Sequence, residues 1–340
     1  MKLETFVSIG ENIHCTRIFK VGGKFCREMD DGQYGIAYKT AAGEKMLPVP
    51  EAFTKRADWE SGKVKHCVVA IWQGVYGSSD GQASGIDYLQ NLASRQEASG
   101  ATYLDINVDE FSTDIDERIK LMEWTVGIVQ QAVKIPMSID SSNTAILKAG
   151  LAACDTERGR PMVNSVSLER EDAVAIAHNA NAVVIASAAG VDGLPDSMEE
   201  RMANINAIIQ TLEATGYERS AIHVDPLVYP ISTDGQNGVR FLDTVKAIRE
   251  NYGPEIHIVA GLSNVSFGMP NRKLINQTYT YLAVEAGADG GIVDPMQINV
   301  DLLNGLDTES EAFGLAKALL LGEDDYGMEY ITASRDGRLG

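Results

Sequence analysis

Basic residues are scarce in this 340-residue chain: 29 lysines and arginines stand against 48 aspartates and glutamates, which leaves a formal net charge of −19. A surface that acidic repels phosphate backbones and anionic lipid headgroups, so we expect no nucleic-acid partner. Cysteine is scarce too, with four residues at wide spacings and no C-x-x-C pair. The sequence therefore predicts neither a disulfide framework nor a zinc site, and we assign no metal ligands.

Long apolar runs are also missing. No stretch approaches the roughly 18 consecutive apolar residues of a membrane span. The first residues, MKLETFVSIGEN, lack the apolar segment of a secretory signal. We therefore expect a cytoplasmic protein without a membrane partner. Neither G-x-G-x-x-G nor a Walker A motif is present, which argues against a nucleotide-binding loop.

Short apolar segments alternate with longer amphipathic segments along the chain. The short ones are largely apolar and mostly carry Val or Ile, as buried parallel strands do; they are 5–9, 101–108, 135–140, 161–166, 181–187, 221–226, 256–263 and 289–295. Helices are predicted between them at 85–100, 114–133, 197–216, 238–253 and 271–287. Strands that alternate with helices in this way favour a (β/α)8 TIM barrel, with residues 1–340 as one domain.

Residues 13–84 interrupt the alternation after the first strand. A connection of that length has a function or a structure of its own. The runs FCREM and YGIAYKT flank the turn signal DDG, which predicts a small β-hairpin. Because the insertion follows the carboxyl end of a strand, we expect it on the catalytic face of the barrel. There it covers the mouth, docks a partner protein, or forms a surface subdomain with neither role.

Polar residues end nearly every predicted strand. They are Glu11-Asn12, Asp105 with Asn107, Asp140-Ser141-Ser142-Asn143, Asn164-Ser165, Asp225-Pro226, Ser263-Asn264 and Asp294-Pro295. A helix cap or an Asx turn explains any one of them. Together they bring many acids and amides to the mouth of a barrel, where each costs roughly 1–3 kcal/mol if it stays buried and unpaired. A ligand with an amidine-like edge, such as a pterin, satisfies both kinds of group.

Several strings around these strand ends resemble the pterin-binding methyltransferases. They are GATYLDINV (100–108), SIDSSN (138–143), VNSVSLER (163–170), HVDPLVYP (223–230) and the long string VAGLSNVSFGMPNRKLINQTYTYLAVEAGADGGIVDP (259–295). This family includes the methyltetrahydrofolate–corrinoid/iron–sulfur protein methyltransferase and the folate domain of cobalamin-dependent methionine synthase. The resemblance implies a TIM barrel that takes tetrahydrofolate or 5-methyltetrahydrofolate as its substrate and exchanges the methyl group with a corrinoid.

The resemblance also implies roles for the matching residues. Those expected to bind the pterin are Asp140, Asn164, Asp225, Asn264, Asn107 and Glu11. Asn264 matches the asparagine that contacts the methyl-bearing nitrogen, and we expect it to act in catalysis together with Asp140. That nitrogen is a tertiary amine and a poor leaving group, so positive charge or a proton on it must be stabilised as the methyl departs. Asn264 is able to do so through its amide oxygen, and the reduced cobalt of the corrinoid is the nucleophile.

The corrinoid is expected to arrive on a separate protein or as free cofactor, because none of the five histidines lies in a D-x-H-x-x-G motif. The paired cysteines of a zinc site for thiol substrates are missing as well. Family members are commonly homodimers, and we expect the same here. One pocket serves transfer in both directions, and we favour transfer from the methylcorrinoid to tetrahydrofolate.

Two other functions stay open at this point. A dihydropteroate synthase shares the pterin barrel, but it needs basic residues of the S-R-K type where this chain reads Ser263-Asn264-Val265. A non-catalytic folate-binding protein would bind the folate without moving its methyl group. The chain also departs from the family at Phe267, where members often carry a polar residue. Arg272 is expected to have a structural role at the start of a helix.

Overall fold

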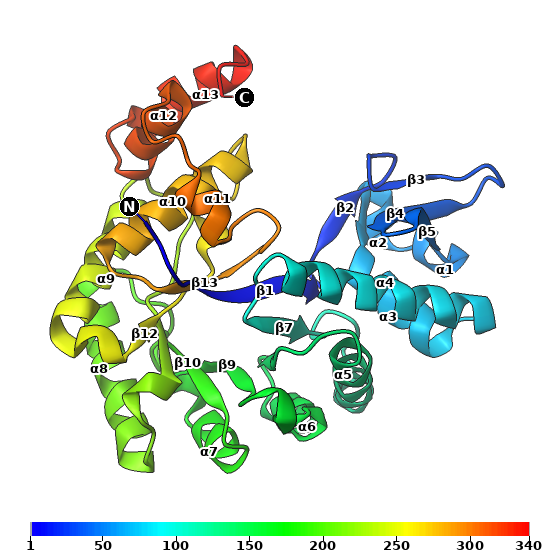
Figure 1. The fold of residues 1–340 in the computed structure, drawn as a ribbon, viewed down its shortest axis with the longest axis horizontal. Helices are drawn as coiled ribbons and strands as arrows, with labels where there is room; N and C mark the ends of the chain where they lie inside the picture. The colour runs from blue at the N-terminus through cyan, green and yellow to red at the C-terminus, as the bar shows by residue number, and fades with distance from the viewer. Residues whose placement is uncertain (1, 340) are drawn as a thin grey trace. The chain divides into compact units, whose positions relative to one another are not determined.

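The structure is a computed structural model and describes residues 2–339. The chain forms two compact units, both drawn in Figure 1. Unit 1 contains residues 2–10, 99–103 and 160–339. Unit 2 contains residues 11–98 and 104–159. The chain passes between the units after residues 10, 98, 103 and 159.

Eight strands form the main sheet, and the sequence predicted a strand at each of these places. In chain order they are β1 (Val7–His14), β7 (Tyr103–Asn107), β8 (Met137–Asp140), β9 (Met162–Val166), β10 (Val183–Ser187), β11 (Ile222–Asp225), β12 (His257–Ile258) and β13 (Gly290–Val293). Their order in the sheet is β12-β11-β10-β9-β8-β7-β1-β13. The two ends of this order are also joined, since Ile292 N donates to Ala260 O at 2.8 Å and Asp289 N to Ile258 O at 3.2 Å. The predicted (β/α)8 barrel is therefore confirmed.

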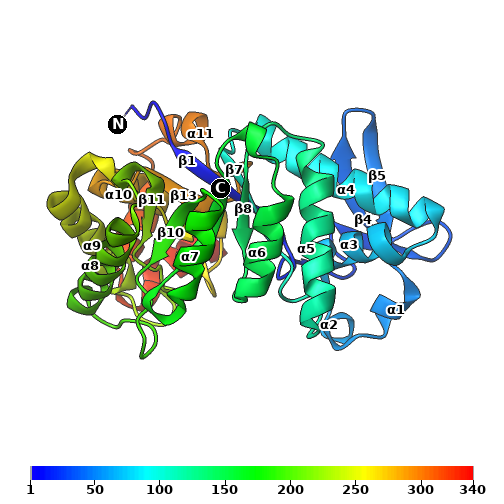
Figure 2. The same ribbon diagram turned by 90° about the horizontal axis from the view of Figure 1, so that it is seen from below.

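The helices of unit 1 follow strands β9 to β13. They are α7 (Asp172–Asn179), α8 (Met198–Thr215), α9 (Asn237–Tyr252), α10 (Arg272–Ala286), α11 (Val300–Asn304), α12 (Glu311–Leu320) and α13 (Met328–Arg335). The predicted helices 197–216, 238–253 and 271–287 agree with α8, α9 and α10 to within a residue at each end. Local chemistry fixes α8, because Ser197 and Glu200 form a capping box and Gly216 ends the helix with φ 97°. In Figure 2, α8 and α9 lie side by side outside β10 and β11.

The helices of unit 2 are α3 (His66–Tyr76), α4 (Ser79–Ala98), α5 (Ile115–Gln130) and α6 (Thr144–Ala153). Helix α4 begins at Ser79, well before the predicted start at residue 85. Gly85 lies inside this helix and faces α3, where a Cβ atom at position 85 would come within 2.4 Å of Ala70 O. Glycine therefore allows α3 and α4 to pack closely along their length.

Most of the long segment before α3 is regular structure. It contains β2 (Ile18–Lys20), β3 (Cys26–Glu28), β4 (Tyr34–Thr40), β5 (Gly43–Pro48), β6 (Lys63–Lys65), α1 (Glu51–Thr54) and α2 (Ala57–Glu60). Strands β3 and β4 pair antiparallel around the DDG turn, and β5 adds a third strand that the sequence analysis did not propose. Strand β2 pairs with β6 in a separate two-stranded sheet. The three-stranded sheet lies beside α4 (Figure 1).

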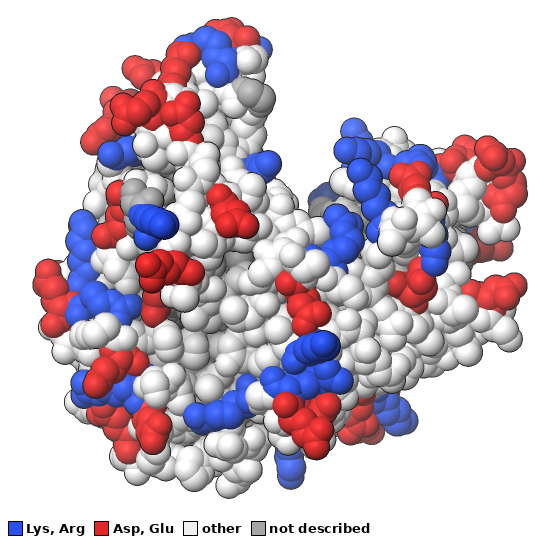
Figure 3. Space-filling view, in the orientation of Figure 1, with Lys and Arg blue, Asp and Glu red and all other residues white. Residues whose placement is uncertain are grey.

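The surface reflects the acidic composition. Figure 3 shows acidic side chains distributed over the helices of unit 1, with basic side chains placed among them. Within residues 2–339, no helix combines the length and the apolar character that crossing a membrane requires. In the same residues, the His, Cys, Asp and Glu side chains form no group of three or more suited to a metal ion.

A buried histidine lies in the sheet of unit 1. His223 of β11 is only 4% exposed, and its ring is stacked on His257 of β12 with centroids 4.6 Å apart. Burial, and after it the positive charge of His257, lowers the pKa of His223 to about 3. His257 in turn contacts Asp289, with 2.8 Å between Nδ1 and Oδ2. His223 is therefore neutral in the folded protein over the whole range in which an exposed histidine becomes charged.

We expect His223 to cost the folded protein stability as the pH falls from 7 to 5. In the unfolded chain His223 takes up a proton near pH 6.5, whereas in the folded protein it stays neutral until about pH 3. Between these pH values the unfolded chain binds one more proton, so a falling pH shifts the equilibrium toward unfolding. The difference corresponds to about 2 kcal/mol of unfolding free energy at pH 5. Urea unfolding of His223→Gln at both pH values should show a smaller loss than wild type, and the exposed His178→Gln should match wild type. An equal loss in His223→Gln would contradict this assignment.

Candidate functional site

Three neighbouring strands, β1, β7 and β8, end within unit 2 in polar side chains that contact one another. Asn107 of β7 is the register partner of Asp140 on β8. Cys15, which directly follows β1, donates its main-chain N–H to Asn107 O at 3.0 Å. Strand pairing therefore brings His14, at the end of β1, next to Asn107 and Asp140.

The carboxylate of Asp140 is held on one side only. Its Oδ2 atom accepts a hydrogen bond from Asn107 Nδ2 at 3.1 Å and lies 3.2 Å from His14 Nε2. Its Oδ1 atom has no hydrogen-bond partner among the residues that the structure describes, and the side chain is 23% exposed. Asp140 therefore presents one fixed and one available acceptor oxygen, as a binding site for an N–H group requires.

Asn107 and Asp109 shape the surroundings of this carboxylate. Asn107 is 7% exposed, and its Oδ1 atom accepts the main-chain N–H of Asp109 at 3.0 Å, so both ends of its amide are occupied. Asp109 accepts from Ser141 Oγ at 2.6 Å and from Ser142 N at 2.8 Å, and thereby orders the turn after β8. Asp109 follows the predicted strand 101–108 directly, but nothing in the sequence marks it as a residue that orders another turn.

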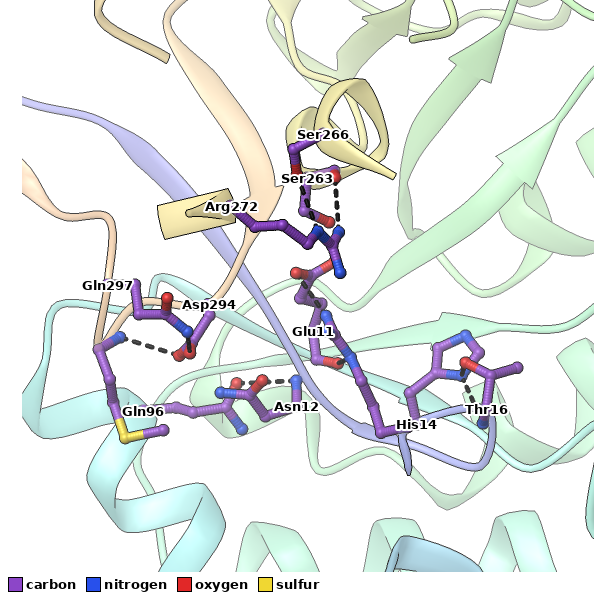
Figure 4. A network of polar contacts seen from close by, with 12 residues as sticks. Glu11, Asn12, His14, Thr16, Gln96, Ser263, Ser266, Arg272, Asp294 and Gln297 are labelled. Carbon is purple, nitrogen blue, oxygen red and sulfur yellow. Dashed lines mark hydrogen bonds and ion pairs between the residues drawn. The ribbon is translucent and has the colours of Figure 1, made fainter. Parts of the chain in front are cut away.

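Glu11 lies on β1 and was also predicted to bind the pterin. Its carboxylate forms an ion pair with Arg17, and Arg17 Nε donates to Glu11 O at 3.3 Å. The neighbouring Asn12 donates its main-chain N–H to Gln96 Oε1 at 3.1 Å (Figure 4). The ion pair gives Glu11 a clear structural role within β1, and its contact with a pterin stays a prediction.

In unit 1, Asp225 ends β11 in an arrangement like that of Asp140. Its Oδ1 atom accepts the main-chain N–H of Leu227 at 2.8 Å. Its second carboxylate oxygen has no hydrogen-bond partner within residues 2–339. Burial raises the pKa of Asp225 to about 6, against the opposing effects of the Leu227 N–H and the positive charge of Arg201. An acid with this pKa changes its charge close to physiological pH.

Arg201 is a neighbour of Asp225 that the sequence analysis missed. It lies in α8, is fully buried, and stacks over the ring of Tyr229 with 4.7 Å from the guanidinium carbon to the ring centroid. A buried cation near a buried acid lowers the cost of ionising that acid. Helical periodicity gave no signal for this role, because an arginine inside an amphipathic helix is ordinarily assigned to its exposed face.

Asn264 lies in a tight turn rather than at the end of a regular strand. Strand β12 stops at Ile258, and residues Leu262–Ser266 form a short 3-10 helix. The main chain of Asn264 is fixed, because its N–H donates to Gly261 O at 3.0 Å and its carbonyl accepts from Phe267 N at 3.2 Å. Its side-chain amide, in contrast, makes no hydrogen bond with any residue from 2 to 339. Asn264 is therefore held rigidly by its backbone while its amide remains available.

Arg272 braces the turn that carries Asn264. At the start of α10 its Nε atom donates to Ser266 Oγ and one terminal nitrogen donates to Ser263 O, both at 2.9 Å (Figure 4). Its guanidinium also lies 4.5 Å from the centroid of the Phe267 ring. This cation–π contact gives the exposed Phe267 a packing partner in the same turn. Arg272 thus contacts both sides of the segment that positions Asn264.

Asn164 lies inside β9. It is opposite Ile185 of β10, and the register shifts before the next pair, Val166 with Ala186, which marks a bulge at Ser165. Bulges re-aim side chains and are common beside functional sites. Arg170 holds the bulge in place by donating to Ser165 Oγ at 2.9 Å.

Unit 1 also contains a cavity of about 780 Å³. Its lining includes Asp196, Glu199, Tyr229, Asp234, Asn237 and Arg240. None of the predicted pterin ligands lines it. The ion pair between Arg240 and Asp234, at 2.6 Å, closes part of its wall. We therefore assign the predicted ligand residues to the strand ends and not to this cavity.

Comparison with known proteins identifies the family. The profile of the pterin binding enzymes matches residues 77–294. The methylcorrinoid:tetrahydrofolate methyltransferase of Eubacterium limosum is 31% identical over 258 residues, which are 74% of this chain and 89% of that protein. The methionine synthase of Mycobacterium tuberculosis is 28% identical over 222 residues, which are 61% of this chain and 18% of that much longer protein.

Solved structures agree on the fold. The dihydropteroate synthase from Xanthomonas albilineans in complex with 7,8-dihydropteroate is similar with a TM-score of 0.54 and 19% identity, over 67% of this chain and 86% of that one. At that identity the likeness concerns the barrel alone. The family profile covers more than half of the chain, and the Eubacterium limosum enzyme is similar over most of its own length. The chain therefore belongs to the pterin binding enzymes, among the methyltransferases of that family.

Proposed function

We propose that this enzyme transfers a methyl group from a methylcorrinoid to tetrahydrofolate, with the corrinoid carried by a separate protein. One observation carries the proposal. Asp140, Asp225 and Asn264 are each fixed by neighbouring groups and each keep a polar side-chain atom without a partner among the described residues. None of these atoms is sealed from solvent, so each is accessible to a ligand and able to exchange water for a hydrogen bond with it.

The chemistry of the three groups suits a reduced pterin. The pyrimidine edge of a pterin offers N–H donors, which the available oxygens of Asp140 and Asp225 are able to accept. Asn164, Asn107 and Glu11 are the other predicted ligands, and Asn107 also donates to Asp140 Oδ2. The side-chain amide of Asn264 both donates and accepts, so it is able to follow a nitrogen whose charge changes during the reaction. The name of the Eubacterium limosum relative supports the direction of transfer.

The role of Asn264 follows from the transfer step. The N5 lone pair of tetrahydrofolate forms the new bond to the methyl carbon, and the electrons of the cobalt–carbon bond stay on cobalt, which passes from Co(III) to Co(I). Positive charge grows on N5 until its proton leaves to solvent. We propose that the amide oxygen of Asn264 accepts the N5–H and stabilises this charge. The same contact would serve the reverse reaction, in which N5 carries the methyl group.

An anaerobic assay tests the function. The purified protein is mixed with tetrahydrofolate and methylcobalamin, and 5-methyltetrahydrofolate is quantified by mass spectrometry. Calorimetry with tetrahydrofolate measures binding separately. Binding together with protein-dependent methyl transfer is the expected result. Binding without transfer, either from methylcobalamin or from a methylated corrinoid protein, would instead indicate a folate-binding protein. Formation of dihydropteroate from its precursors would favour the synthase.

A further inference from the structure

His14 is an ionisable group in direct contact with Asp140. Thr16 donates its main-chain N–H to His14 Nδ1 at 3.2 Å, and Thr16 Oγ1 lies 2.7 Å from the same atom (Figure 4). A main-chain N–H is only a donor, so Nδ1 acts as the acceptor and the neutral ring carries its proton on Nε2. That proton points to Asp140 Oδ2, 3.2 Å away. The local backbone therefore selects the tautomer that donates to Asp140.

The ring lies at the start of a tight turn that also fixes its backbone. Arg17 donates its main-chain N–H to His14 O at 3.0 Å, and its side chain returns to Glu11. Asn107 holds the same oxygen of Asp140 from the neighbouring strand, at 3.1 Å. Two donors on Oδ2 leave Asp140 little freedom to rotate. Its other oxygen, Oδ1, is then the one that remains for a ligand.

We propose that His14 is a positioning residue for tetrahydrofolate, which fixes Asp140 with Oδ1 toward the pterin and couples folate binding to its own protonation. The inference rests on the proposed function, because it assumes that Asp140 accepts N–H groups of the pterin. It adds a residue that no part of the family resemblance pointed to.

The charges around His14 determine the direction of the coupling. Burial lowers the pKa of His14, but the hydrogen bond and the charge of Asp140, together with the charge of Asp105, outweigh both burial and Arg17, so the pKa is raised overall. Pterin N–H groups bound at Oδ1 would draw negative charge away from His14. Tetrahydrofolate should therefore lower the pKa of His14, and by reciprocity protonation of His14 should weaken folate binding.

Two substitutions separate positioning from simple packing. His14→Ala removes the donor and should raise the dissociation constant for tetrahydrofolate by about tenfold or more, the usual effect of losing one hydrogen bond to a charged group. His14→Gln places an amide N–H close to the position of Nε2 and should restore affinity to near wild type. Because Gln does not titrate, its affinity should lack the part of the pH dependence that His14 causes. His178→Gln, an exposed histidine of α7, is the matched control.

The pKa of His14 itself provides a readout that a purely structural role would not move. NMR titration of histidine-labelled wild-type protein, with and without tetrahydrofolate, measures the pKa of each of the five histidines. The signal that is missing in His14→Gln is the signal of His14. A lower pKa of His14 in the folate complex supports the inference. This measurement uses wild-type protein, so it holds even if His14→Ala does not fold. An unchanged pKa, or wild-type affinity in His14→Ala, overturns the inference and leaves the proposed function intact. Absence of tetrahydrofolate binding in wild type would overturn both.

Discussion

Asn264→Ala is expected to lower the rate of methyl transfer by about 10²-fold or more, in line with the loss of one preorganised group at a developing charge. The turn around Asn264 is fixed by main-chain hydrogen bonds to Gly261 and Phe267 and by the Arg272 brace. Alanine keeps all of these contacts. The substitution therefore removes the amide while the backbone stays in place. Single-turnover transfer from methylcobalamin to tetrahydrofolate measures the change directly.

The division of the effect between rate and affinity is the decisive part of this experiment. A group that acts mainly on the charged transition state should change kcat far more than the dissociation constant of tetrahydrofolate. Asn179→Ala, at an exposed position of α7, controls for the loss of an asparagine side chain. Transfer by Asn264→Ala at the wild-type rate would remove Asn264 from the reaction. A large loss of affinity with an unchanged rate would make it a binding residue only.

The barrel was predictable because its signal is local. The strands are largely buried, so each reads as a short apolar run, and β10 is buried at every position. Caps mark the helices equally well, as Ser197 and Gly216 do for α8. Strand β12 shows the limit of this approach. The predicted strand 256–263 ends after His257–Ile258 because the chain turns into the 3-10 helix Leu262–Ser266, although its apolar character continues.

The support around the predicted ligands was not predictable, because it depends on contacts across strands. Asp109 orders the turn after β8 through Ser141 and Ser142, which lie more than thirty positions further along the chain. His14 meets Asp140 only because β1, β7 and β8 are neighbours. Residue types at strand ends therefore indicate which groups bind a ligand. They do not indicate which groups hold those side chains in place.

Asp225→Asn is expected to weaken tetrahydrofolate binding by about 10- to 100-fold, since it exchanges a carboxylate for a neutral amide at a hydrogen bond with the ligand. Wild-type affinity should itself depend on pH. Burial raises the pKa of Asp225 to about 6, so below pH 6 the acid is protonated and loses its acceptor. The dissociation constant of wild type should then rise about tenfold per pH unit below pH 6, whereas that of Asp225→Asn should lack this rise and keep only the pH dependence that His14 causes. Calorimetry between pH 5 and pH 8 tests both.

The same substitution should make the folate-free protein more stable. A raised pKa means that the stability contributed by Asp225 is present below pH 3.8 and is lost as the pH rises through about 6. At pH 7 the buried charge therefore costs about 1–3 kcal/mol, which the neutral amide avoids while its oxygen still accepts the Leu227 N–H. Urea unfolding at pH 7 should show Asp225→Asn above wild type, with the exposed Asp192→Asn unchanged. If Asp225→Asn is more stable and also binds folate more weakly, the charge of Asp225 serves ligand binding, because it lowers the stability of the folate-free protein.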